Sequence, residues 1–168
     1  MAKEKKENKR KSETIITIIS ACIIVIMITV IIMVGINQPQ KTQRTLTNQT
    51  EENIKFDNKK INVYFFYGDG CPHCEELINF LNNLPEKYNK YFDLYTMEVW
   101  YNEENNKLME DLVAELGKKV EGVPCLIIGN QVFFGYSTSM DQELKKAIKE
   151  KYEKMDKFDV YQQYNSKA

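Results

Sequence analysis

The chain has 168 residues, enough for one domain of ordinary size with some chain to spare. With 43% hydrophobic and 28% charged residues and 7 glycines, the composition argues against a disordered chain, a collagen-like repeat and a protein that crosses a membrane many times. The net charge of -1 conceals an asymmetry, because residues 1–13 carry six Lys and Arg against three Glu, whereas the chain from Ile61 onward carries 12 against 18 Asp and Glu. Since an acidic domain repels phosphate, no nucleic acid is expected among its partners.

An uncharged apolar run extends from Ile15 to Ile36. As a helix rising about 1.5 Å per residue it would be about 33 Å long, which matches the hydrocarbon core of a bilayer. The sequence therefore predicts a single-pass anchor in the cell membrane. Residues 1–14 form a basic cytoplasmic segment in this interpretation, and the rest of the chain is extracytoplasmic. Ile19 to Cys22 also resembles a bacterial lipobox, which leaves lipidation of Cys22 as an alternative, although the apolar run continues well past Cys22.

A folded domain is predicted over residues 61–155, between a flexible, solvated linker at 37–60 and a C-terminal tail at 156–168 that is expected to fray. The linker is rich in Gln, Thr, Asn and Lys and has few apolar residues. Hydrophobic periodicity, turn residues and capping residues predict, in chain order, a strand at Ile61–Tyr67, a helix at Pro72–Leu84, a strand at Phe92–Val99, a helix at Glu103–Leu116, strands at Val123–Ile128 and Gln131–Phe134, and a helix at Ser139–Tyr152. The order β-α-β-α-β-β-α predicts an α/β fold with a mixed four-stranded sheet and flanking helices.

The chemistry of the sequence concentrates in Cys71-Pro72-His73-Cys74, where the first strand turns into the first helix. Pro72 suits the first helical position, which places Cys71 at the N-cap, where unpaired N–H groups and the helix dipole favour a thiolate. Residues three apart lie on one helical face, so the sulfurs of Cys71 and Cys74 are close enough for a disulfide. His73, the single histidine of the chain, can add positive charge or a hydrogen bond that lowers the pKa of the Cys71 thiol.

The sequence resembles the thioredoxin superfamily in three features: the first strand, the C-x-x-C motif at a helix N-terminus, and the later Val123-Pro124 before a hairpin. The Cys-Pro-His-Cys tetrapeptide is similar to that of the DsbA family of extracytoplasmic thiol oxidases. The resemblance covers about Ile61 to Tyr152. It implies that Cys71 is the exposed nucleophile and Cys74 the buried resolving thiol. It also implies that Pro124 is a cis-proline beside the pair, and that the Val123 backbone pairs with an extended substrate segment.

Two features depart from these families. DsbA-type proteins resemble thioredoxin with a sizeable helical insertion, but the stretch between Val99 and Val123 has room for one helix. Many members of the superfamily also have a buried carboxylate six residues before the first cysteine, where this chain has Phe65. Asp69 or solvent would then have to accept the proton of the resolving thiol.

Other interpretations of the cysteines stay open. A C-x-x-C motif can be half of a zinc site, but zinc needs four ligands. The ligands that the predicted domain offers are Cys71, His73, Cys74 and Cys125. His73 cannot easily bind a metal together with the two sulfurs that flank it, so no metal is expected. The pair can also be an inert structural disulfide. Cys125 is either a small core residue or an accessory thiol that accepts or regulates the disulfide.

The sequence therefore predicts a membrane-anchored extracytoplasmic thiol-disulfide oxidoreductase that needs no cofactor. Its partners would be extracytoplasmic proteins with thiols or disulfides and an unidentified redox partner. A lower thiolate pKa makes the disulfide more oxidising, so His73 favours the oxidase direction over the reductase direction. The alternative is a module that binds a peptide or a metal in the same cleft without turnover.

Overall fold

The computed structural model describes residues 17–31, 43–57, 59–154 and 158–167. The chain divides into two units, 1–40 and 41–168, which are considered separately.

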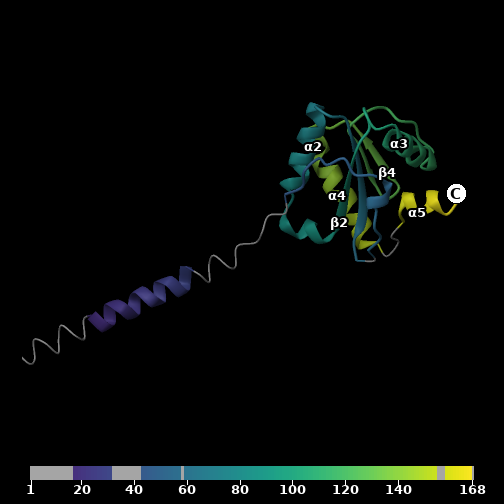
Figure 1. Ribbon diagram of the computed structural model, residues 1–168. Coiled ribbons are helices and arrows are strands. Elements are labelled where there is room, and N and C mark those ends of the chain that lie inside the picture. Colours follow the sequence, from purple (N-terminus) through teal and green to yellow (C-terminus); the bar gives the residue numbers. More distant parts are fainter. Residues whose placement is uncertain (1–16, 32–42, 58, 155–157, 168) are drawn as a thin grey trace, which may run out of the picture. The chain divides into compact units, whose positions relative to one another are not determined.

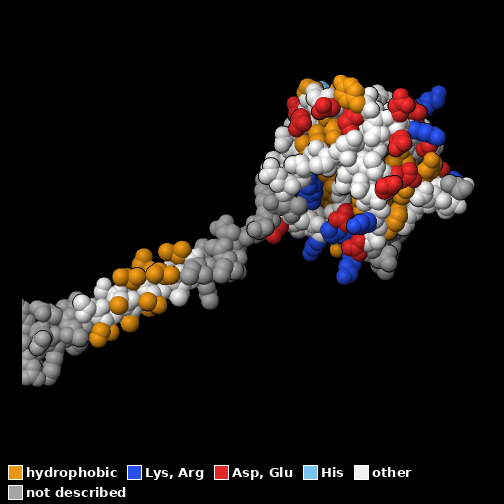
Figure 2. All heavy atoms as spheres, viewed as in Figure 1, with side chains coloured by type: hydrophobic (Ala, Val, Ile, Leu, Met, Phe, Trp, Pro, Cys, Tyr) orange, Lys and Arg blue, Asp and Glu red, His pale blue; other side chains and the backbone are white. Residues whose placement is uncertain are grey.

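In the first unit, residues 17–31 form a helix whose large hydrophobic side chains are exposed (Figure 2). Within the described residues, no helix combines the length and the apolar character needed to cross a membrane. The remainder of the predicted anchor, the basic segment 1–14 and the first residues of the predicted linker, 37–42, lie outside the described residues.

The second unit contains a four-stranded sheet with the strand order β2-β1-β3-β4 (Figure 1). Its strands are β1 at Ile61–Tyr67, β2 at Phe92–Glu98, β3 at Cys125–Ile128 and β4 at Gln131–Phe134. β1 and β2 are parallel, whereas β1 with β3 and β3 with β4 are antiparallel. This confirms the predicted mixed sheet, and the arrangement is compatible with a thioredoxin-like fold.

Helices cover both faces of the sheet (Figure 1). They are α2 at Pro72–Asn82, α3 at Glu103–Glu115, α4 at Asp141–Glu153 and α5 at Val160–Asn165. Short 3-10 helices lie at Glu51–Asn53, Glu86–Lys90 and Thr138–Met140. Side chains of α2 and α4 pack on one face and side chains of α3 and α5 on the other, so the sheet has two separate cores.

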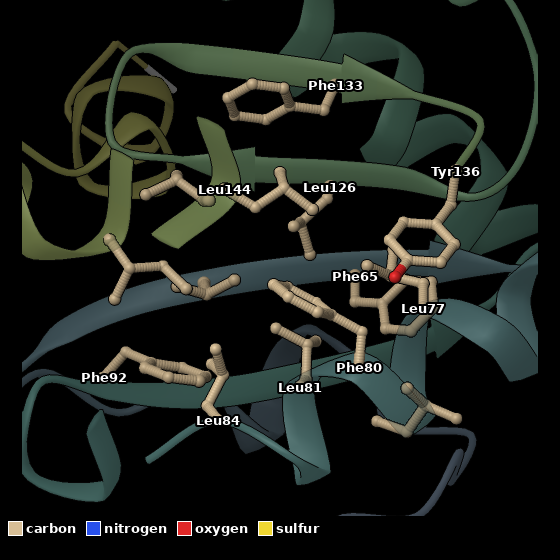
Figure 3. Close-up of a cluster of buried hydrophobic side chains, with 14 of the residues drawn as sticks. Phe65, Leu77, Phe80, Leu81, Leu84, Phe92, Leu126, Phe133, Tyr136 and Leu144 are labelled. Atoms are coloured by element: carbon tan, nitrogen blue, oxygen red, sulfur yellow. The ribbon is translucent and has the colours of Figure 1, made fainter. Parts of the chain in front are cut away.

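Alternation along β1 determines which residues enter which core. Val63, Phe65 and Tyr67 point toward α2 and α4, in the cluster shown in Figure 3, whereas Tyr64 and Phe66 point toward α3 and α5. All five side chains are buried, because a central strand of a sheet covered on both faces has no solvent-facing side. Cys71 and Cys74 belong to the first cluster, which places the reactive motif on the α2/α4 face.

The segment 43–57 packs against the domain, which corrects the prediction of a solvated linker for these residues. The Gln49 N–H donates to the Thr96 carbonyl at 2.9 Å, and the Thr96 N–H donates to the Gln49 side chain at 2.8 Å. Leu46 packs on the α2/α4 core. The polar composition of this segment was misleading, because its amides and hydroxyls bond to the free edge of β2 rather than to water.

The end of the chain also belongs to the fold, which corrects the frayed tail for residues 158–167. Asp159 caps α5 by accepting the N–H groups of Tyr161 and Gln162, and it accepts the Tyr64 hydroxyl at 2.8 Å. Val160 is fully buried and Tyr161 is buried in the α3/α5 core. A helix of six residues shows little periodicity, so the sequence alone does not predict it.

Candidate redox site

The Cys71–Cys74 pair lies where β1 passes into α2. The helix begins at Pro72, so Cys71 is its N-cap residue, as the sequence predicts. The Cys71 Sγ accepts a hydrogen bond from the Cys74 backbone N–H at 3.3 Å, in the place that a Ser or Asp oxygen takes at many helix N-termini. The sulfur of Cys71 therefore lies at the positive end of the helix dipole, where a thiolate is stabilised.

Cys71 and Cys74 form a disulfide bond, and their Cα atoms are 5.3 Å apart. The exposed fraction of Cys71 is 6%, whereas Cys74 is 0% exposed. Both residues lie in the α2/α4 cluster, so Cys71 is largely buried rather than exposed as the resemblance implies, and Cys74 is the more deeply buried of the two. This difference favours attack at Cys71, while its role as nucleophile stays a prediction.

The peptide bond between Val123 and Pro124 is cis. β3 starts at the next residue, Cys125, which pairs with Phe66 near the end of β1, so Pro124 lies at the same end of the sheet as the loop that leads into α2. Among the described residues, the Val123 backbone makes no hydrogen bond to another backbone group outside the sheet and the helices. The predicted pairing of Val123 with an extended substrate therefore has an available backbone edge.

His73 is turned toward Glu76 rather than held at the disulfide. Its Nδ1 lies 3.0 Å from a Glu76 carboxylate oxygen, and the two side chains are 65% and 58% exposed. Residues three apart on a helix are neighbours, whereas residues two apart, such as Cys71 and His73, do not face each other. The positive charge that the sequence offers to the thiolate is thus partly neutralised by Glu76.

The candidate proton acceptors fall in different surroundings. Asp69 is exposed in the loop before Cys71. Phe65, six residues before Cys71, is fully buried in the α2/α4 core. Asp69 and solvent stay the predicted acceptors for the proton of Cys74.

One buried carboxylate near the site was missed by the sequence analysis. Glu98, the last residue of β2, is 6% exposed and pairs in register with Tyr67. Its carboxylate accepts the backbone N–H groups of Trp100 at 2.7 Å, Tyr101 at 2.9 Å and Asp69 at 3.4 Å. The parallel pairing of β1 and β2 was the signal that could have found it, because it brings the end of β2 beside the loop before Cys71.

Carboxylates outnumber cations in the chain segments at this end of β1 and β2. Residues 66–80 and 98–106 together contain six Asp and Glu and no Lys or Arg. Burial, followed by the carboxylates of Glu98, Asp69 and Glu75, raises the pKa of Tyr67, the residue at the end of β1. These carboxylates oppose a thiolate at Cys71, and they favour partners that carry positive charge.

Cys125 lies on the other face of the sheet from the disulfide. It is fully buried in the α3/α5 core, and burial raises the pKa of its thiol to about 12. A neutral, enclosed thiol is a poor nucleophile, so this position favours the core role over the accessory role.

Among the residues that the structure describes, no three His, Cys, Asp or Glu side chains are arranged to hold a metal ion.

No known family model matches the chain, and no curated protein does. Among solved structures, it is similar to the glutaredoxin grx-1 of Archaeoglobus fulgidus, with 24% identity over 51% of this chain and 84% of that chain, and with a TM-score of 0.36. At this TM-score the likeness decides nothing about activity, which has to be inferred from the geometry at Cys71 and Cys74.

Proposed function

We propose that the folded unit is a protein thiol-disulfide oxidoreductase whose reactive group is the Cys71–Cys74 disulfide. The observation that supports this most is the position of the pair across the first turn of α2, with Cys71 as the N-cap and Cys74 buried behind it. A structural disulfide has no need of a helix N-terminus, whereas a redox pair does, because the helix end stabilises the thiolate that forms on reduction.

In the oxidase direction, a substrate thiolate attacks the Cys71 Sγ. The Cys71–Cys74 bond breaks, and the Cys74 sulfur leaves as a thiolate that takes a proton from solvent. A second substrate thiolate then attacks the substrate sulfur of the mixed disulfide and releases Cys71 as a thiolate. The substrate gains a disulfide and loses two electrons, which the pair accepts. A partner protein with its own disulfide oxidises the pair again by the same exchange.

The direction of net transfer depends on how strongly the reduced pair is stabilised. The helix N-terminus and the Cys74 N–H favour the Cys71 thiolate, which makes the disulfide more oxidising. We therefore prefer the oxidase direction, with the support now coming from the helix end rather than from His73, because His73 is paired with Glu76.

The test of this function is a trap for the mixed disulfide. In Cys74→Ser no Cys71–Cys74 disulfide can form, but the Cys71 thiolate can still attack a disulfide of an oxidised substrate or redox partner. Cys74 is absent and cannot release the resulting mixed disulfide, so it should appear as a dithiothreitol-sensitive adduct on non-reducing gels. Cys125→Ser is the matched control, because it makes the same change on the other face of the sheet and should give no adducts. Absence of adducts in Cys74→Ser, together with peptide or metal binding by the wild type, would favour a binding module.

The redox potential tests the direction. Equilibration of the purified protein with glutathione gives the potential of the Cys71–Cys74 couple, and a value near the thioredoxin value of about -270 mV would overturn the oxidase preference.

We propose in addition that Ile15 to Ile36 anchors the unit to the cell membrane, with the unit on the extracytoplasmic side. The support is the uncharged run and the basic residues before it in the sequence. The chain should stay in the membrane fraction after alkaline extraction, whereas residues 41–168 alone should be released. If Cys22→Ala also releases the chain, the anchor is a lipid on Cys22.

A further inference from the structure

Two aromatic side chains beside the redox site are exposed without an evident reason. Trp100 is 54% exposed and Tyr101 is 81% exposed, and they are the second and third residues after the end of β2. In the described part of the folded unit, Phe56 is the other large hydrophobic residue with comparable exposure, at 47%, and it stacks on Tyr161 of α5. Trp100 is the single tryptophan of the chain.

The parallel pairing of β1 and β2 places Trp100 next to the loop that carries Cys71. Tyr67 and Glu98 are register partners, so the chain leaves the two strands side by side. The indole of Trp100 lies against Gly68, where an added Cβ would be 2.1 Å from the nearest ring atom. Gly68 is also bonded to Cys71, since its carbonyl accepts the Cys71 N–H at 3.1 Å. Gly68 thus contacts the ring of Trp100 and is hydrogen-bonded to the Cys71 backbone.

Glu98 holds the backbone that carries the ring. Its buried carboxylate accepts N–H groups from both loops, those of Trp100 and Tyr101 on one side and that of Asp69 on the other. Burying a carboxylate is costly unless it is well bonded, so these hydrogen bonds hold the two loops in one arrangement. The exposed face of Trp100 is therefore a formed surface rather than a loose side chain.

Resting on the proposed function, we propose that Trp100 binds the substrate, and that it selects cysteines that have a Lys or Arg beside them in an extended segment. An indole face attracts a cation through its quadrupole. The carboxylates of Asp69, Glu75 and Glu98, which lie near Tyr67 at the end of β1, attract the same cation. Glu98 is the positioning residue that holds Trp100 against Gly68.

The test uses three dithiol peptides that differ only in the residue beside the reactive cysteine, which is Lys, Leu or Glu. Oxidation of each peptide by the disulfide form of the full chain gives kcat/KM, and the ratio between peptides measured with one protein needs no correction for the amount of active enzyme. We expect the wild type to prefer the Lys peptide over the Leu peptide, and the Leu peptide over the Glu peptide.

In Trp100→Ala the preference for Lys over Leu should fall about three- to tenfold, the size of a cation–π contact that is partly removed from water. Trp100→Phe should keep part of it. Phe56→Ala is the matched control, because Phe56 is an exposed aromatic near Ile61, at the opposite end of β1, and this variant should keep the wild-type preference. An unchanged ratio in Trp100→Ala, or a wild type that does not distinguish Lys from Leu, would overturn the proposal.

Two further variants test the positioning role. Gly68→Ala keeps Trp100 but must displace its ring, because the new Cβ cannot occupy the same space. Glu98→Gln keeps the shape of the side chain but replaces an accepting oxygen by an N–H₂ group. In both, the emission of the sole tryptophan should shift and the preference for Lys should fall as in Trp100→Ala; unchanged emission and preference in Glu98→Gln would refute the role of Glu98.

Failure of the proposed function looks different from failure of this inference. If the wild-type pair does not exchange with glutathione disulfide at all, the oxidoreductase proposal fails. If exchange is normal and the peptide preferences are absent, only the role of Trp100 fails.

Discussion

The contribution of His73 to the redox potential should be small, although its place inside the C-x-x-C motif suggests a large one. In the structure its imidazole is 65% exposed and pairs with Glu76. Since no contact joins the His73 side chain to Cys71 in the described part of the chain, a charge on its imidazole should act on the thiolate no more strongly than charges in an exposed ion pair act on each other, about 0.2–1 kcal/mol. For a two-electron couple, about 1.4 kcal/mol corresponds to 30 mV. His73→Ala should therefore lower the potential of the Cys71–Cys74 couple by less than about 20 mV.

Glu76→Gln provides the opposite change. It leaves the imidazole without its counter-charge, so the Cys71 thiolate is better stabilised and the potential should rise by a similar amount, less than about 20 mV. The potentials are measured by glutathione equilibration at pH 7 for the wild type, both single variants and the double variant, which should return close to the wild-type value. A drop of more than about 60 mV in His73→Ala would refute this reasoning. It would mean that His73 leaves Glu76 on reduction and contacts the thiolate directly.

Four further predictions concern the two cores and the edge of β2. Asp159→Ala removes the cap of α5, worth about 1 kcal/mol, and takes away the acceptor of the buried Tyr64 O–H, worth about 1–3 kcal/mol. Urea unfolding should therefore show a loss of about 2–4 kcal/mol. Burial raises the pKa of Asp159, although its hydrogen bonds act in the opposite direction, so the folded state holds the Asp159 proton more tightly than the unfolded state. The free energy of unfolding should therefore fall as the pH rises from the ordinary aspartate pKa through the raised one. Asp159→Asn should not show this fall. In the reduced protein at pH 7, iodoacetamide should modify Cys71 first and leave Cys125 unmodified until urea unfolds the chain. Peptide mass spectrometry measures both modifications, and equal modification of the two cysteines in the folded protein would contradict the burial of Cys125. The Gln49 amide should exchange slowly with D₂O because it bonds to Thr96, and exchange at the rate of a free peptide would mean that 43–57 is a solvated linker after all.

Much of the sheet could be predicted because its signals are local. Ile61–Tyr67 is a nearly continuous apolar run, as expected for a central strand covered on both sides, and its predicted bounds match β1. Asn is a favoured N-cap residue, and the Asn102 side chain accepts the Asn105 N–H at 3.0 Å at the start of α3. Gly129-Asn130, a dipeptide typical of β-hairpin turns, separates β3 from β4.

The residues that the sequence did not reveal are those whose role depends on distant partners. Glu98 reads as an ordinary polar residue at the end of a strand, and only the pairing of β1 with β2 shows that Asp69 bonds to it. Asp159 likewise reads as part of a charged tail until α5 places it beside Tyr64. Composition describes a residue's neighbours along the chain, whereas burial and hydrogen bonding depend on neighbours in space.

The site combines two opposed electrostatic effects, and their geometry indicates which one dominates at Cys71. The helix end acts directly, through the Cys74 N–H at 3.3 Å from the Cys71 sulfur. The carboxylates of Asp69 and Glu75 act from exposed positions, where water weakens their repulsion of a thiolate. A substrate that covers the site would remove that water and strengthen the repulsion unless it brought a positive charge of its own. A cation beside the substrate cysteine would therefore serve both binding at Trp100 and stabilisation of the thiolate that Cys71 becomes.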